Sequence, residues 1–223
     1  MFDATSYLSN LVQGRDAVVK SRPTLPLTDE GSDIDIYTLD SESLISSLLE
    51  TARRSNVDCV KVESLDANHF PVDIMDKGRL LCKFDLYSDF PTYKRFSVSP
   101  GLFSEIVSDG SIKESFEENH NFPTPRKLHE GLIRYLEYCE YFSIGPDKLH
   151  HYEWILSHLT DEERGEMFLM AHRFINFPIE ISTPNSRVNP VAWLLTFLGA
   201  SKTLRRLAPS KVVRIARRLA SHL

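Results

Sequence analysis

The sequence predicts an α+β fold: a small mixed β-sheet with flanking helices, then a helical domain, then a basic helical tail. Short runs rich in β-branched and aromatic residues gather before residue 90. Apolar residues then recur at helical spacing from residue 124. From residue 181 the chain has eight Lys or Arg and no Asp or Glu, whereas all 31 acidic residues precede it. We therefore expect domains over 1–120, 121–180 and 181–223.

The first half of the chain supplies the predicted sheet. A short helix is expected within 2–13, and Ser41 is a favoured N-cap for a helix that ends near residue 55. Lys77-Gly78 is typical of the turn in an antiparallel hairpin. The predicted strands cover 17–19, 34–39, 57–65, 70–75 and 80–87.

The second half changes to helical patterns. Thr124-Pro125 predicts a cap followed by proline in the first turn of a helix, which Gly145-Pro146 ends. Another helix is expected over 147–159. Thr160 to Glu163 has the form of a capping box, which predicts a third helix through 167–175.

The segment Gly31-Ser32-Asp33-Ile34-Asp35-Ile36 is the most informative part of the chain. Residues two apart on a strand project from one face, so Asp33 and Asp35 point the same way while Ile34 and Ile36 enter a core. Mg²⁺ takes oxygen ligands and binds through one or two carboxylates together with substrate phosphates. The pattern predicts a divalent-metal site.

Asp85 is the expected third carboxylate. Alternation along its strand places it on the face opposite to Phe84 and Leu86. Three other acidic residues compete for this role: Asp73, Asp76 and Asp89. With Asp85 near Asp33 and Asp35, one or two metal ions would position a triphosphate and neutralise its charge.

These residues resemble the DNA polymerase beta-like nucleotidyltransferase superfamily over about the first half of the chain. Its signature is a Gly-Ser turn, then Ser-Asp-x-Asp on the next strand, then a later strand Asp; Ser32 to Asp35 and Asp85 match the last two elements. The resemblance implies Mg²⁺-dependent transfer of a nucleoside monophosphate from a nucleoside triphosphate, with Mn²⁺ as a substitute ion. Asp33 and Asp35 are then metal ligands, and Asp85 is a ligand or base.

The chain departs from the family pattern upstream of this strand. It reads Lys20-Ser21-Arg22 where the family has Gly-Ser, so the glycine that permits close backbone approach to phosphate is absent. The expected phosphate contacts are Ser21, Arg22, Gly31 and Ser32. Arg22 is included because its guanidinium fork matches phosphate oxygens. Segment 21–27 is also similar to a subgroup associated with surface-glycan gene clusters.

The helical half adds one expected nucleotide contact. The stretch 147–151 is similar to the Lys-x-x-His stretch on the helical domain of such proteins, and Lys148 and His151 would share a helix face. Lys148 would reach the triphosphate. The other histidines, His69 among them, show no ligand spacing, and we expect them on the surface or in the core.

Two other functional classes stay open. Asp-x-Asp also holds metal-bound nucleotide-sugars in glycosyltransferases, although a nucleotide-binding βαβ unit should then precede it and only about thirty residues do. Loss of the glycine leaves a non-catalytic binding module as the other alternative. The acceptor of a nucleotidyl group is a hydroxyl or phosphate of a small molecule, a glycan or a protein.

Composition and charge indicate the cellular location and the kinds of partner to expect. Three cysteines without C-x-x-C spacing argue against a disulfide framework or a zinc site, so we expect a cytoplasmic protein. The acidic body argues against nucleic acid as a partner. The tail 202–223 has an apolar face flanked by basic residues, which predicts peripheral contact with anionic lipid at the inner face of a membrane, or docking onto the acidic body of the chain or a partner subunit.

Overall fold

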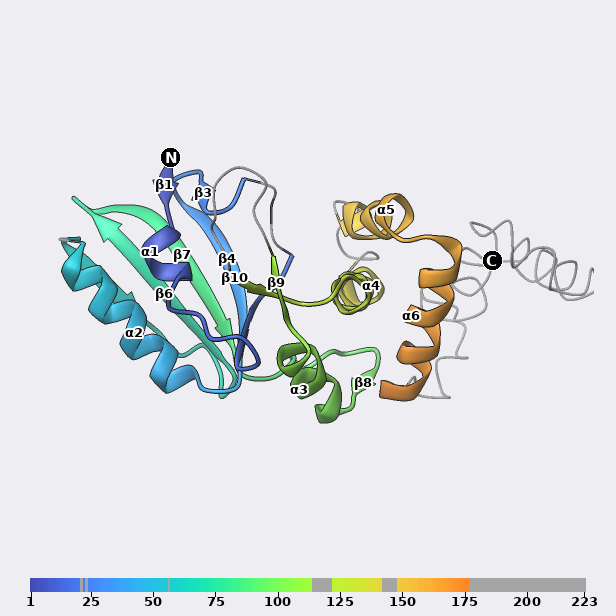
Figure 1. Ribbon diagram of the computed structural model, residues 1–223. Helices are drawn as coiled ribbons and strands as arrows, with labels where there is room; N and C mark the ends of the chain where they lie inside the picture. The colour runs from blue at the N-terminus through green and yellow to red at the C-terminus, as the bar shows by residue number, and fades with distance from the viewer. Residues whose placement is uncertain (21, 23, 56, 114–121, 142–147, 177–223) are drawn as a thin grey trace, which may run out of the picture. The chain divides into compact units, whose positions relative to one another are not determined.

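The computed structural model describes residues 1–20, 22, 24–55, 57–113, 122–141 and 148–176 (Figure 1). The chain divides into two compact units. The first unit comprises Met1–Tyr93 and Val98–Ile133, and the second comprises Lys94–Ser97 and the chain from Arg134 onward. The predicted α+β class is confirmed, with a mixed sheet in the first unit and helices in both.

A five-stranded sheet organises the first unit, in the order β2-β4-β7-β6-β5. Its strands are β2 (Asp16–Val18), β4 (Ser32–Thr38), β5 (Cys59–Val62), β6 (His69–Asp76) and β7 (Arg79–Tyr87). β4 and β7 are parallel, whereas the other neighbours are antiparallel. The turn between β6 and β7 has positive φ at Lys77 and Gly78, as a type I′ hairpin requires, so the predicted hairpin is confirmed.

The other strands are short. β1 (Phe2–Asp3) pairs with β3 (Leu27–Thr28), and β9 (Ser111–Lys113) pairs with β10 (Phe122–Thr124). β8 covers Ser97–Val98 and β11 covers Ile175–Asn176. The helices are α1 (Thr5–Leu8), α2 (Ser41–Arg54), α3 (Pro100–Ser108), α4 (Lys127–Tyr141), α5 (Leu149–His158) and α6 (Asp161–Phe174).

Several helix starts differ from the sequence prediction. Asp40, not Ser41, caps α2, because its carboxylate accepts the Ser43 backbone N–H at 3.1 Å. Thr124 pairs with Ser111 in the β9–β10 ladder, and α4 begins at Lys127, later than the predicted start after Thr124. The helix expected within 2–13 is present only as the short helix α1. The residues before α1 form β1.

Two further outcomes concern α3 and α6. The prediction missed α3, although Pro100 at its first position is a helix-start signal. The capping box of α6 is confirmed: Thr160 Oγ1 accepts the Glu163 N–H at 3.2 Å, and the Glu163 carboxylate accepts the Thr160 N–H at 2.7 Å.

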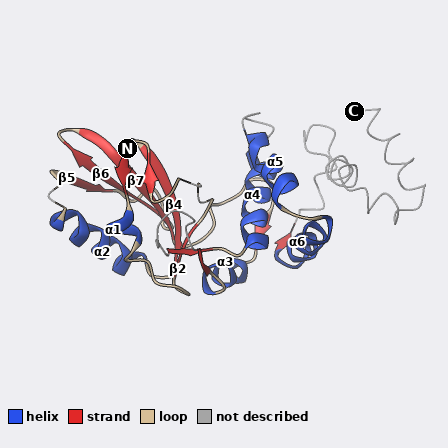
Figure 2. Ribbon diagram, turned by 45° about the horizontal axis from the view of Figure 1, so that its top comes forward, coloured by secondary structure: helices blue, strands red, loops and turns tan. Residues whose placement is uncertain are grey.

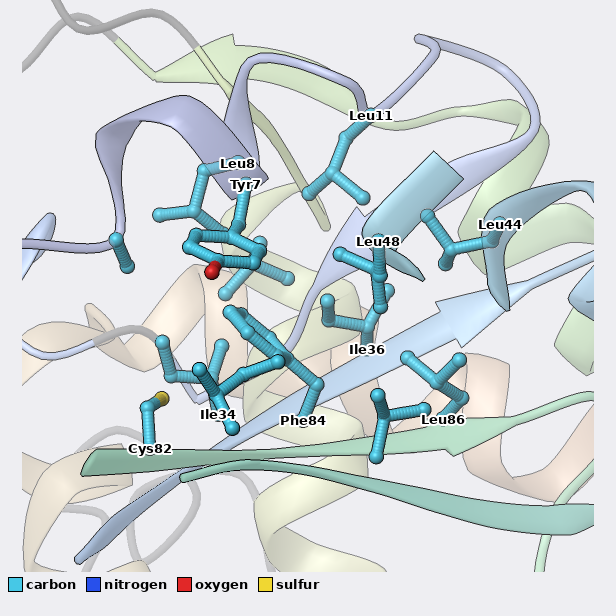
Figure 3. Close-up of a cluster of buried hydrophobic side chains, with 14 of the residues drawn as sticks. Tyr7, Leu8, Leu11, Ile34, Ile36, Leu44, Leu48, Cys82, Phe84 and Leu86 are labelled. Carbon is cyan, nitrogen blue, oxygen red and sulfur yellow. The ribbon is translucent and has the colours of Figure 1, made fainter. Parts of the chain in front are cut away.

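Helices α1 and α2 cover one face of the sheet, as both ribbon views show (Figure 2). The predicted alternation holds there, since Ile34 and Ile36 from β4 and Phe84 and Leu86 from β7 are at most 4% exposed. These four side chains meet others from α1 and α2, including Tyr7, Leu8, Leu44 and Leu48 (Figure 3). This apolar layer holds the two strands that carry the acidic motif in register.

The second unit is built around α5, α6 and the end of α4. Tyr138 stacks on Tyr152 with ring centroids 5.1 Å apart, and the Arg134 guanidinium lies 4.6 Å from the Trp154 ring centroid. Tyr135 is almost fully buried and packs in the interior.

Three sequence-based predictions fall outside the described residues. These are the phosphate contact by Ser21, the helix end at Gly145-Pro146 and the amphipathic tail 202–223. Among the helices that the structure does describe, none has the length and apolar character needed to cross a bilayer.

Candidate metal centre

Three carboxylates converge on the sheet face opposite to α1 and α2. Asp33 and Asp35 lie on β4, and Asp85 lies on the parallel strand β7, directly opposite Asp35 in the ladder. One oxygen from each carboxylate lies within 4.8 Å of the other two. Asp85 lies beside Asp35 because neighbouring strands are only ~4.8 Å apart. The predicted convergence is confirmed, while metal ligation by these residues stays a prediction.

Exposure falls steeply across the triad. The side chain of Asp33 is 54% exposed, that of Asp35 is 18% exposed and that of Asp85 is 6% exposed. The group is therefore open to solvent on the Asp33 side and closed beneath Asp85. A ligand reaching all three carboxylates would arrive over β4.

Basic side chains pair with both carboxylates of β4. Lys20 Nζ lies 2.6 Å from Asp35 Oδ2, and Arg22 Nη2 donates to Asp33 Oδ1 at 3.0 Å. Arg22 also donates through Nη1 to Ser32 Oγ at 3.4 Å. Arg22 and Ser32 thus lie together beside the triad, where the family resemblance predicts phosphate contacts.

Asp85 is held through both of its oxygens. Lys83 Nζ lies 2.9 Å from Oδ2, and His69 Nε2 lies 2.9 Å from Oδ1. The ring of His69 stacks on Tyr87 with centroids 4.3 Å apart. The hydrogen bond to Asp85 raises the pKa of the Lys83 ammonium, so Lys83 is cationic at neutral pH.

The contact of His69 with the triad was not predicted. His69 is partly buried, and it is hydrogen-bonded to the most buried carboxylate of the triad. Sequence spacing gave no signal for this contact. It arises because β6 pairs with β7 so that His69 lies opposite Tyr87, two residues from Asp85.

The three cations explain how three carboxylates can share so small a space. Two like charges ~5 Å apart repel by about 3 kcal/mol at an effective dielectric constant of ~20. Lys20, Arg22 and Lys83 together carry the charge that balances the triad. A divalent cation would supply the same compensation, and it would compete with the two ammonium groups for carboxylate oxygens.

Lys20 and Gly31, which precede β4, both have positive φ. Lys20 has φ 53°, in the left-handed region that glycine adopts most readily. Gly31 has φ 79°, and a Cβ added there would meet nothing within 4 Å. The turn at Lys20 thus has the backbone shape of a glycine turn, and its side chain adds an ammonium at Asp35.

The remaining predicted residues are distributed as follows. Lys148 precedes α5 in the second unit, where its Nζ lies 6.0 Å from the Tyr141 ring centroid, so its role toward a triphosphate stays a prediction. His151 is buried and lies 2.9 Å from Glu137. Among the rivals of Asp85, Asp73 shares the sheet face one strand away, and neither Asp76 nor Asp89 joins the triad.

Comparison with family models, with curated proteins and with solved structures finds no match to this chain. The family resemblance therefore rests on the residues of the motif and on their arrangement.

Proposed function

We propose that this chain is a Mg²⁺-dependent nucleotidyltransferase that moves a nucleoside monophosphate from a nucleoside triphosphate to a hydroxyl or phosphate acceptor. The observation that carries the proposal is the meeting of Asp33, Asp35 and Asp85 from two parallel strands. Carboxylate oxygens are the donor set that Mg²⁺ and Mn²⁺ take, and substrate phosphates complete their coordination. The exposed side of the triad leaves room for those phosphates.

The reaction assigns a role to each group. Bound Mg²⁺ would neutralise the triphosphate and polarise its α-phosphate. The acceptor oxygen attacks the α-phosphorus, the bond from that phosphorus to the β-phosphate oxygen breaks, and pyrophosphate leaves. Asp85 accepts the acceptor's proton or serves as a ligand, and Arg22 and Ser32 contact phosphate oxygens.

A non-catalytic module is the second candidate, favoured by one specific observation. Lys20 and Lys83 already provide ammonium groups to Asp35 and Asp85, which is the compensation a metal would otherwise provide. Such a module would bind phosphates through its basic groups without a metal. The glycosyltransferase alternative is weaker, because the described residues before Asp33 form short strands and one helical turn and contain no βαβ unit.

Metal-dependent nucleotide binding separates the two candidates. The full chain is titrated with each nucleoside triphosphate with and without Mg²⁺, and candidate acceptors and the protein are weighed by mass spectrometry after incubation. We expect the acceptor to gain the mass of a nucleoside monophosphate less one water, and a loss of about 100-fold or more in rate for Asp33→Asn and Asp35→Asn. Asp76→Asn, the same change outside the triad, is the control and should retain the rate.

The opposite results identify the alternatives. Triphosphate binding that is unchanged by chelation of metal would support the non-catalytic module. Preference for a nucleotide-sugar, with release of the nucleoside diphosphate, would support glycosyl transfer.

A further inference from the structure

A row of alternating charges crosses the sheet beside the triad. Asp33 on β4 lies opposite Lys83 on β7, Lys83 lies opposite Asp73 on β6, and Asp73 lies opposite Lys61 on β5. Directly opposed residues project from the same face with Cβ atoms ~5 Å apart. Lys83 therefore has a carboxylate on each side in the row, in addition to Asp85 two residues along its own strand.

Lys83 forms an ion pair with one of these three carboxylates, Asp85. Its ammonium lies 2.9 Å from Asp85 Oδ2, while Asp33 and Asp73 act on it only through longer-range attraction. The side chain of Lys83 is 34% exposed, so its flexible stem is not locked by packing. A small rotation would bring the ammonium to either neighbour in the row.

Asp73 has an unused acceptor. Its Oδ1 is inaccessible to solvent and has no hydrogen-bond partner among the described residues. A buried carboxylate oxygen without a donor is costly and rare, so an unpaired one requires an explanation. Lys61, the other lysine beside Asp73, is paired with Glu63. Lys83 is thus the cation placed to supply the missing donor.

We propose that Lys83 is the resident counter-ion of the triad and that a divalent cation displaces its ammonium from Asp85 to Asp73. This inference rests on the proposed metal site. Lys83 occupies Asp85 Oδ2. A metal ion on that same oxygen would repel the ammonium strongly, so binding of the metal there displaces Lys83. Asp73 lies opposite Lys83 on the neighbouring strand β6 and accepts the displaced ammonium, which keeps the lysine charge compensated. The pair Lys83 and Asp73 therefore sets the affinity of the metal site.

The test is a double-mutant cycle on metal binding. Mn²⁺ affinity of the purified full chain is measured by electron paramagnetic resonance, without nucleotide, for the wild type, Lys83→Met, Asp73→Asn and the double variant. We expect Lys83→Met to bind Mn²⁺ about tenfold more tightly because the competitor is gone. Asp73→Asn should bind about fivefold more weakly because Lys83 then stays on Asp85.

The coupling between the two changes is the decisive result. In the Lys83→Met background, Asp73→Asn should change the affinity by less than about twofold, since no lysine remains to be relocated. Lys61→Met removes the same charge from the same row one strand farther away, and it should leave the affinity within about twofold of the wild type. Far-UV circular dichroism checks that each variant is folded, and Lys83→Gln repeats the cycle with a different side chain.

Each of the remaining outcomes would overturn a named part of this proposal. Equal weakening by Asp73→Asn in both backgrounds, or no tightening in Lys83→Met and Lys83→Gln, would overturn the exchange while leaving the metal site intact. Binding of Mn²⁺ to Lys83→Met but not to the wild type would also overturn the exchange, because the metal would then fail to displace Lys83 from Asp85. Absence of Mn²⁺ binding in both the wild type and Lys83→Met would overturn the metal site and the exchange together.

Discussion

The two faces of the five-stranded sheet are built from the same strands and have opposite characters. On β4, Ile34 and Ile36 enter the apolar layer beneath α1 and α2, whereas Asp33 and Asp35 project from the other face. One face removes apolar surface from water, and the other gathers charge. A single period-two alternation therefore produces both the core and the candidate site.

The covered face should contribute mainly to folding stability, and the charged face should contribute mainly to the chemistry of the candidate site. Apolar burial scales with the area removed from water, so the covered face should provide most of the folding free energy. The charged face pairs ions that compensate one another, and exposed pairs add little to stability. Substitutions on the two faces should differ accordingly, which the following predictions test in order of decreasing effect.

Phe84→Ala should have the largest effect on folding. Phe84 is fully buried, and its ring centroid lies 5.4 Å from that of Tyr7. We expect a loss of about 3 to 5 kcal/mol in the free energy of unfolding, measured by urea denaturation with circular dichroism. Lys83→Ala, one residue away on the opposite face, should cost less than about 1 kcal/mol. Similar losses for both variants would refute the contrast between the faces.

Asp85→Asn and Asp33→Asn sharpen the comparison within the charged face. Asp85 is buried and bound through both oxygens, so its neutralisation weakens two charge-assisted contacts and should cost about 1 to 2 kcal/mol. Asp33 is more than half exposed, and its replacement should change stability by less than about 0.5 kcal/mol. Urea denaturation without metal measures both values. A larger loss for Asp33→Asn would contradict the burial gradient across the triad.

Lys20→Gly should have a smaller effect on stability than Asp85→Asn. Glycine relieves the positive φ of Lys20, but it adds conformational freedom to the unfolded chain and removes the ion pair with Asp35. These contributions oppose one another, so the free energy of unfolding should change by less than about 1 kcal/mol. Lys20→Ala removes the same ion pair and keeps the unfavourable φ, so it should be the less stable of the two. The reverse order would show that φ at this position carries no cost.

Local pattern predicted most of the first unit but not its irregular parts. The five strands of the sheet, helix α2 and the facing directions of Ile34, Asp35 and Asp85 all follow from alternation or helical spacing. The cap of α2 shifted to Asp40 because Asp and Ser are both favoured there. Thr124 lies in the β9–β10 ladder, a pairing between segments that the local cap pattern does not encode.

The partners of the triad were predicted only where they are close in sequence. Arg22 and Ser32 flank the motif and were expected beside it, and both are found there. Lys83 had a signal that could have been used, because it lies two residues from Asp85 and so shares its face. His69 and Asp73 reach the site or its margin only because β6 pairs with β7 in one particular register.

By itself, the sequence determined which side chains share a face, because alternation along a strand is a local property of the backbone. The tertiary structure decided which strands are neighbours and in which register, and hence that Asp85 stands opposite Asp35 and Lys83 stands between Asp33 and Asp73. Strand order and register depend on contacts between residues far apart in the chain. Packing of the whole core selects those contacts, and no short segment encodes them.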